Sequence, residues 1–142
     1  MTPDAHLHRP SLRKPGDPLR VVIADDDRDI ALSLKEVVED LGDEAFATFS
    51  GSGAIELTSA THPDVLLLDL SLPDANGLTV AATIRALERR ENLKIIAVTG
   101  SSDDQSRRQT AAAGFDLHLA KPVRLGVLES MLDLLRSAPA TA

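Results

Sequence analysis

The sequence predicts a doubly wound α/β domain, in which helices cover both faces of a parallel five-stranded sheet. Three observations lead to this prediction. From Leu19 onward, short aliphatic runs alternate with longer segments of helical periodicity. The runs VVIA, VLLL and IIAV are apolar throughout, as expected of strands that are buried on both sides. The chain of 142 residues is long enough for one domain with one sizeable core.

The predicted elements alternate strictly along the chain. Strands are expected at residues 19–24, 44–49, 64–69, 93–99 and 117–120. Helices are expected at residues 29–42, 52–61, 77–90, 102–114 and 124–137. Every strand is therefore followed by a helix, which is the arrangement of consecutive parallel β-α units.

The first two units have clear boundaries. The first strand is rich in β-branched residues, and Gly42 ends the helix that follows it. The apolar face of that helix consists of Ile30, Leu34, Val37, Val38 and Leu41. The second strand carries two phenylalanines, and Pro63 prevents the helix after it from continuing.

The last three units differ in how much apolar surface their helices carry. The third helix follows Gly77 and the aliphatic third strand, whereas the fourth helix has no apolar side chain larger than alanine before Gly114 ends it. We therefore expect the fourth helix to be weakly anchored and free to move. The fifth helix carries leucines on one face, namely Leu125, Leu128, Leu132 and Leu135.

Composition limits the possible partners and locations. The net charge of −7 disfavours non-specific binding to nucleic acid and to anionic membranes. The chain has no cysteine, no signal-peptide core and no apolar run of membrane-spanning length, so we expect a cytoplasmic protein that does not enter membranes. Residues 1–18 are rich in proline and are predicted to be a disordered tail, followed by one domain at 19–137 and a short tail at 138–142.

Polar residues stand at the carboxyl ends of four of the five predicted strands. Asp25, Asp26 and Asp27 follow the first strand, and the others are Asp69, Thr99 and Lys121. Open α/β sheets bind ligands at the carboxyl ends of their strands. Taken singly, the acids could be helix caps, Thr99 a strand residue and Lys121 a solvated lysine. Their occurrence at one edge of the sheet favours a functional site.

The acids suggest a magnesium site. Carboxylates held close together repel one another unless a cation lies between them. Oxygen ligands without cysteine or a suitably placed histidine are typical of Mg²⁺, which commonly bridges carboxylates and phosphate oxygens. The hydroxyl of Thr99 and the ammonium of Lys121 could then donate to phosphoryl oxygens, while one carboxylate acts as nucleophile.

The segments VVIADDD, VLLLDLSLPDANG, IIAVTG and AGFDLHLAKP, in this order, resemble the response-regulator receiver domain of two-component signalling. The resemblance covers residues 19–137, and the last segment is similar to receivers attached to hybrid histidine kinases. It implies a flavodoxin-like fold with strand order 2-1-3-4-5. It also implies that Asp69 is the phosphoacceptor and that Mg²⁺ binds Asp25, Asp26, Asp69 and the backbone carbonyl of Ser71.

The resemblance further implies roles for the remaining site residues and for partners. Thr99 matches the switch hydroxyl and Lys121 the lysine that pairs with the acceptor, while His118 stands where receivers usually carry Tyr or Phe. The phosphoryl group would come from a histidine kinase or a phosphotransfer protein. We expect a phosphoprotein that assists its own phosphorylation and slow autodephosphorylation without being an enzyme. With five residues after Ser137 and no output domain in this chain, it would signal as a stand-alone receiver through contacts with a downstream protein.

Two other functions are compatible with parts of the pattern. A magnesium-dependent phosphohydrolase of the haloacid-dehalogenase type also uses an aspartyl nucleophile, but it places a second acid two residues on, where this chain has Ser71. A flavodoxin-like interaction module without phosphotransfer is also possible, because a fold does not determine function. Magnesium-dependent labelling by a small phosphodonor would distinguish all three.

Overall fold

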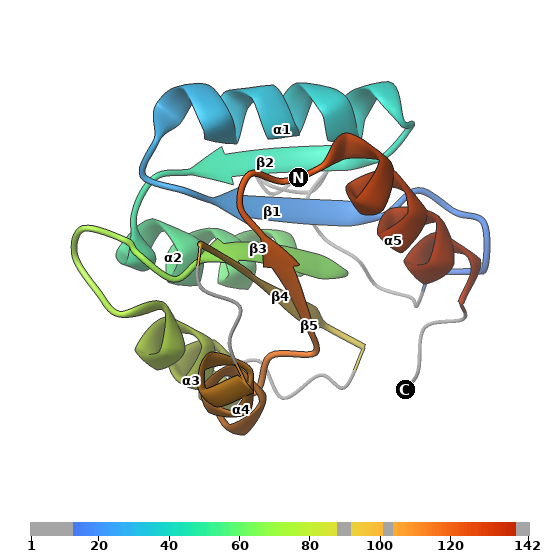
Figure 1. Cartoon of the computed structure of the whole chain (residues 1–142). Helices are drawn as coiled ribbons and strands as arrows, with labels where there is room; N and C mark the ends of the chain where they lie inside the picture. The colour runs from blue at the N-terminus through green and yellow to red at the C-terminus, as the bar shows by residue number, and fades with distance from the viewer. Residues whose placement is uncertain (1–12, 88–91, 101–103, 139–142) are drawn as a thin grey trace, which may run out of the picture.

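The computed structural model describes residues 13–87, 92–100 and 104–138 (Figure 1). Its elements are β1 (Arg20–Ala24), α1 (Arg28–Asp40), β2 (Glu44–Thr48), α2 (Gly51–Thr61), β3 (Val65–Asp69), α3 (Gly77–Leu87), β4 (Lys94–Thr99), α4 (Asp104–Ala112), β5 (Leu117–Ala120) and α5 (Leu125–Ser137). The strands form one parallel sheet in the order β2-β1-β3-β4-β5. The predicted fold class and strand order are confirmed.

Helices cover both faces of the sheet. Figure 1 shows α1 and α5 on one face and α2, α3 and α4 on the other. Alternate residues of a strand point to opposite faces, so each central strand contributes to two cores. In β3, Val65 and Leu67 pack with the α1 and α5 leucines, whereas Leu66 and Leu68 pack with α2 and α3. Burial on both faces is the physical reason that the central strands are continuously apolar.

Short-range signals set the helix boundaries. The side chain of Asp27 accepts a hydrogen bond from the Ile30 amide and so caps the start of α1. The α2 helix ends at His62, which adopts a left-handed conformation with φ of 48° directly before Pro63. The predicted extension of the third helix to residue 90 and the start of the fourth at 102 lie outside the described residues.

The N-terminal prediction requires a correction. Residues 1–12 are outside the described part, but residues 13–18 also belong to the predicted disordered tail, and this segment is hydrogen-bonded to the domain. Residues 14–18 are exposed, yet the Gly16 amide donates to the Arg136 carbonyl oxygen at 2.9 Å. The Arg13 side chain is only 5% exposed and donates hydrogen bonds to backbone oxygens at the end of α5. The prediction failed here because it considered only apolar burial, whereas this segment is held by hydrogen bonds to a guanidinium group.

Across the described helices, none is both long and apolar enough to cross a membrane.

Candidate phosphoacceptor site

The predicted site residues come together at the carboxyl edge of the sheet. Asp69 and Thr99 are the last residues of the adjacent strands β3 and β4. Asp25 directly follows β1, and Lys121 directly follows β5. The Lys121 amide donates a hydrogen bond to the Thr99 carbonyl oxygen at 2.9 Å, so the last ladder bond of β4 and β5 places Lys121 beside the site.

Three carboxylates form the centre of the site. Asp25, Asp26 and Asp69 each offer an oxygen, and these oxygens lie within 4.8 Å of one another. Asp25 and Asp69 are each 2% exposed, whereas Asp26 is exposed. Asp27 is not part of this group, because its side chain caps α1. The donor set of three hard oxygens, one open to solvent, fits Mg²⁺.

Lys121 provides the positive charge of the site. Its ammonium Nζ lies 2.9 Å from Oδ2 of Asp69 and 3.6 Å from Oδ2 of Asp25. Burial opposes the charged form, but the hydrogen bond and charge of Asp69, together with the charge of Asp25, raise the pKa of Lys121. The ammonium is therefore protonated at neutral pH and bridges the two buried carboxylates.

Asp25 lies in an environment that disfavours its charge. Burial raises the pKa of Asp25, a hydrogen bond from the Asp27 amide lowers it, and the nearby charge of Asp69 raises it again. The charge of Lys121 also lowers the pKa of Asp25, but the overall direction is upward. The single positive charge of Lys121 thus offsets only part of the negative charge of the three neighbouring carboxylates. A divalent cation would neutralise the rest.

The remaining predicted residues lie around this centre. Ser71 is exposed, and its amide donates a hydrogen bond to Oδ1 of Asp69 at 2.9 Å. Thr99 is 9% exposed at the end of β4. His118 is half-buried on β5 and lies away from the carboxylates, where it lines a cavity of about 310 Å³ together with Arg107, Thr110 and Phe115. The cavity lies between α4 and β5.

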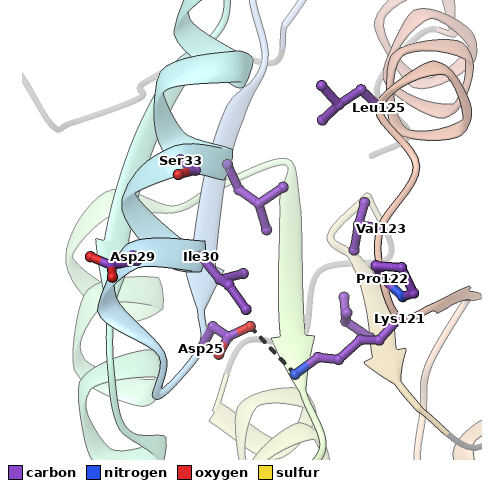
Figure 2. Close-up of a pocket in the computed structure, with 10 residues that line it drawn as sticks. Asp25, Asp29, Ile30, Ser33, Lys121, Pro122, Val123 and Leu125 are labelled. Carbon is purple, nitrogen blue, oxygen red and sulfur yellow. Dashed lines mark ion pairs between the residues drawn. The ribbon is translucent and has the colours of Figure 1, made fainter.

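A largely apolar groove adjoins the carboxylates and was not predicted. The cavity has a volume of about 570 Å³ and runs between α1 and the segment that joins β5 to α5 (Figure 2). Its walls include Ile30 on α1 and Leu125 on α5, and Asp25 and Lys121 lie at one end. Ile30 is 40% exposed and Leu125 54% exposed, although both belong to the predicted apolar faces of their helices. Both residues lie in the first turns of their helices. This position at the helix start is the feature of the sequence that could have indicated their exposure.

Comparison with known proteins relates this chain to one family. Residues 21–133 match the family described as response regulator receiver domain. The transcriptional regulatory protein PrrA of Mycobacterium leprae is 32% identical over 124 residues, which cover 87% of this chain and 52% of PrrA. The virulence sensor protein BvgS of Bordetella bronchiseptica is 30% identical over 137 residues, covering 93% of this chain and 11% of BvgS. The chain therefore spans about half the length of PrrA and a small part of BvgS.

Solved structures agree with this relation. A putative response regulator from Chloroflexus aurantiacus superposes with a TM-score of 0.77 at 27% identity, covering 86% of this chain and all of the other.

Proposed function

Because this chain belongs to the response regulator receiver domain family, we propose that Asp69 accepts a phosphoryl group from a phosphohistidine on a histidine kinase or phosphotransfer protein. The observation that supports this proposal most strongly is the contact of Lys121 with Asp69 at 2.9 Å, inside a group of three carboxylates. A buried carboxylate at a strand end, held by an ammonium and open to solvent on the Asp26 side, is positioned to act as a nucleophile.

The chain's own residues orient both oxygens of the acceptor. Oδ1 of Asp69 accepts a hydrogen bond from the Ser71 amide, and Oδ2 accepts one from Lys121. In the transfer, an Asp69 oxygen forms a bond to phosphorus while the phosphorus–nitrogen bond of the phosphohistidine breaks, and the imidazole nitrogen keeps that electron pair. Lys121 stabilises the negative charge of the phosphoryl oxygens. Bound to Asp25, Asp26, Asp69 and the Ser71 carbonyl, Mg²⁺ would neutralise further charge on the carboxylates and phosphoryl oxygens.

The phosphorylated protein would signal through protein contacts. The new charge on Asp69 attracts the hydroxyl of Thr99 and shifts an existing equilibrium of α4 and β5, where His118 lies. The protein is a phosphoacceptor that assists its own phosphorylation and slow autodephosphorylation, and it turns over no separate substrate. Its partners are the phosphodonor and a downstream protein.

The first test is labelling with a small phosphodonor in the presence and absence of Mg²⁺. Asp69→Asn should abolish acid-labile incorporation, because the amide keeps the size of the side chain and removes the nucleophilic charge. Asp27→Asn is the matched control and should label normally, because Asn is an equally good helix cap and Asp27 lies outside the carboxylate group. Label that persists in Asp69→Asn would contradict the assignment. Release of phosphate with rapid turnover would indicate a phosphohydrolase instead.

A further inference from the structure

The loop between β3 and α3 is attached at its tip to a different helix. Asp74 lies in this loop, five residues after the phosphoacceptor. Its Oδ1 accepts a hydrogen bond from the Gly51 amide at 2.6 Å, and its Oδ2 accepts one from the Ser52 amide at 3.0 Å. Gly51 and Ser52 are the first two residues of α2, so one carboxylate binds the start of a helix that is distant in sequence.

The start of α2 needs this carboxylate. The first amides of a helix have no partner within the helix and carry partial positive charge. The first turn of α2 contains no acidic residue, and the side chain of its own cap, Ser50, accepts a hydrogen bond from the Gly53 amide and not from the Gly51 or Ser52 amide. Asp74 therefore supplies both the missing acceptors and the negative charge. The hydrogen bonds from Gly51 and Ser52 lower the pKa of Asp74, which is accordingly ionised at neutral pH.

Close backbone contacts hold the loop on both sides. A Cβ atom built on Gly51 would lie 2.9 Å from Cγ2 of Val80 on α3 and 3.0 Å from Cβ of Ala75 in the loop, so a larger residue at this position would require these side chains to shift. At the base of the loop, a Cβ on Gly77 would lie 2.7 Å from Cα of Leu70. The tip of the loop is thus packed against the first residue of α2, and at its base Gly77, the first residue of α3, packs on Leu70.

The loop contacts extend from Asp74 back to the acceptor. Ser71 and Asn76 form an antiparallel bridge across the loop, which links the strand side of the loop to its helix side. Ser71 in turn donates its amide to Oδ1 of Asp69. A change in the position of the loop tip therefore alters the segment that contacts the phosphoacceptor. Without the Asp74 contacts, the loop would sample more conformations, and ordering it would oppose binding at the site.

We propose that Asp74 is a positioning residue for the phosphoacceptor loop: by binding the start of α2 it holds Ser71 and Asp69 in the arrangement that takes up Mg²⁺ and the phosphoryl group. This inference rests on the proposed function. Asp74 itself touches neither group, and its role is to reduce the freedom of the loop before they bind.

The experiment compares Asp74→Ala, Asp74→Asn and Glu56→Gln with the wild-type protein. Glu56→Gln is the matched control because it removes one negative charge from an exposed position of the same helix, α2. Mg²⁺ affinity is measured by titration calorimetry without phosphodonor, far below the thermal midpoint. Exchange of the Ser71 amide is measured in metal-free protein, and labelling by a small phosphodonor is measured over a range of Mg²⁺ concentrations.

Asp74→Ala should weaken Mg²⁺ binding about tenfold, at the lower end of the effect of residues that orient metal ligands. It should also speed Ser71 exchange and shift the Mg²⁺ dependence of labelling to higher concentration. Asp74→Asn, which keeps one acceptor oxygen, should fall between Asp74→Ala and the wild type, and Glu56→Gln should match the wild type. Asn is also the variant to use if Asp74→Ala does not fold.

Unchanged Mg²⁺ affinity and unchanged Ser71 exchange in folded Asp74→Ala and Asp74→Asn would overturn the inference, even if their thermal midpoints fell. An equal loss in Glu56→Gln would also overturn it, because the cause would then be net charge. If the wild-type protein itself neither bound Mg²⁺ nor became labelled, the proposed function would fail and the inference with it. That outcome is recognisable because it does not depend on any variant.

Discussion

At the scale of single residues, the charge on Asp25 conflicts with the stability of the fold. Asp25 and Asp69 are both 2% exposed, and one lysine lies between them. Burial and the charge of Asp69 raise the pKa of Asp25 despite the opposing effects of the Asp27 amide and Lys121. A carboxyl group whose pKa is raised on folding binds its proton more tightly in the folded state. The free energy of unfolding therefore falls as pH rises from the ordinary Asp range through the raised value, and it stays lower at neutral pH.

Replacing Asp25 by Asn should therefore stabilise the protein when Mg²⁺ is absent. We expect the free energy of unfolding at pH 7 to rise, because Asn removes the buried negative charge beside Asp69. The Asn oxygen can still accept the Asp27 amide, so the local backbone is preserved. Denaturant unfolding with a chelator present measures the change, and the advantage should disappear below about pH 4, where Asp is protonated in both states. A less stable Asp25→Asn protein at pH 7 would show that attraction to Lys121 outweighs burial.

At the scale of elements, the groove between α1 and the segment that joins β5 to α5 offers an apolar surface next to Asp25 and Lys121, where under the proposed function a protein phosphodonor would dock. Ile30 and Leu125 expose apolar side chains at the first turns of these helices, close to Asp25 and Lys121 (Figure 2). Under the proposed function, a protein donor would have to bring its phosphohistidine to Asp69, whereas a small phosphodonor would need no docking surface. Comparing a protein donor with a small phosphodonor therefore distinguishes a loss of donor binding from a loss of phosphoryl transfer.

Ile30→Ser should slow transfer from a phosphorylated histidine protein and leave labelling by a small phosphodonor unchanged. Loss of an apolar contact of this kind corresponds to about 1 to 2 kcal/mol, or roughly tenfold in transfer efficiency. The control is Leu87→Ser, which removes a leucine that is 62% exposed at the end of α3, outside the groove. Transfer is measured with a panel of purified histidine kinases, using any that phosphorylate the wild type. Equal slowing by both variants would assign the effect to general loss of apolar surface.

At the scale of the whole molecule, the sequence predicted the features that follow from periodicity and strand order. Buried strands such as Val65–Asp69 carry a continuous apolar signal, and residues at their carboxyl ends must meet at one edge, so Asp25, Asp69 and Lys121 could be placed together. The contacts of Asp74 and Arg13 could not be predicted. Both bind backbone atoms of elements distant in sequence, and backbone partners leave no pattern in the side chains.

Arg13 joins the two ends of the described chain. Its guanidinium donates hydrogen bonds to the carbonyl oxygens of Leu135 at 2.8 Å, Arg136 at 2.7 Å and Ala138 at 2.9 Å. The last carbonyls of a helix lack partners within the helix, and α5 ends without the glycine that often caps this position. Arg13 is therefore a cap for α5 that comes from the other end of the domain. α5 packs on the sheet through Leu128 and Leu132.

Arg13→Ala should lower the free energy of unfolding by about 2 kcal/mol, the range for hydrogen bonds to a charged group that is largely buried. For a domain of this size the thermal midpoint should fall by several degrees. Arg13→Lys should recover only part of the loss, because an ammonium cannot reach all three carbonyls in the planar geometry of a guanidinium. Lys14→Ala, the exposed neighbour, serves as control and should leave the midpoint unchanged. The rate of amide exchange in the last turn of α5 should rise in Arg13→Ala and not in Lys14→Ala. Equal thermal midpoints for these two variants would mean that the N-terminal segment does not stabilise α5.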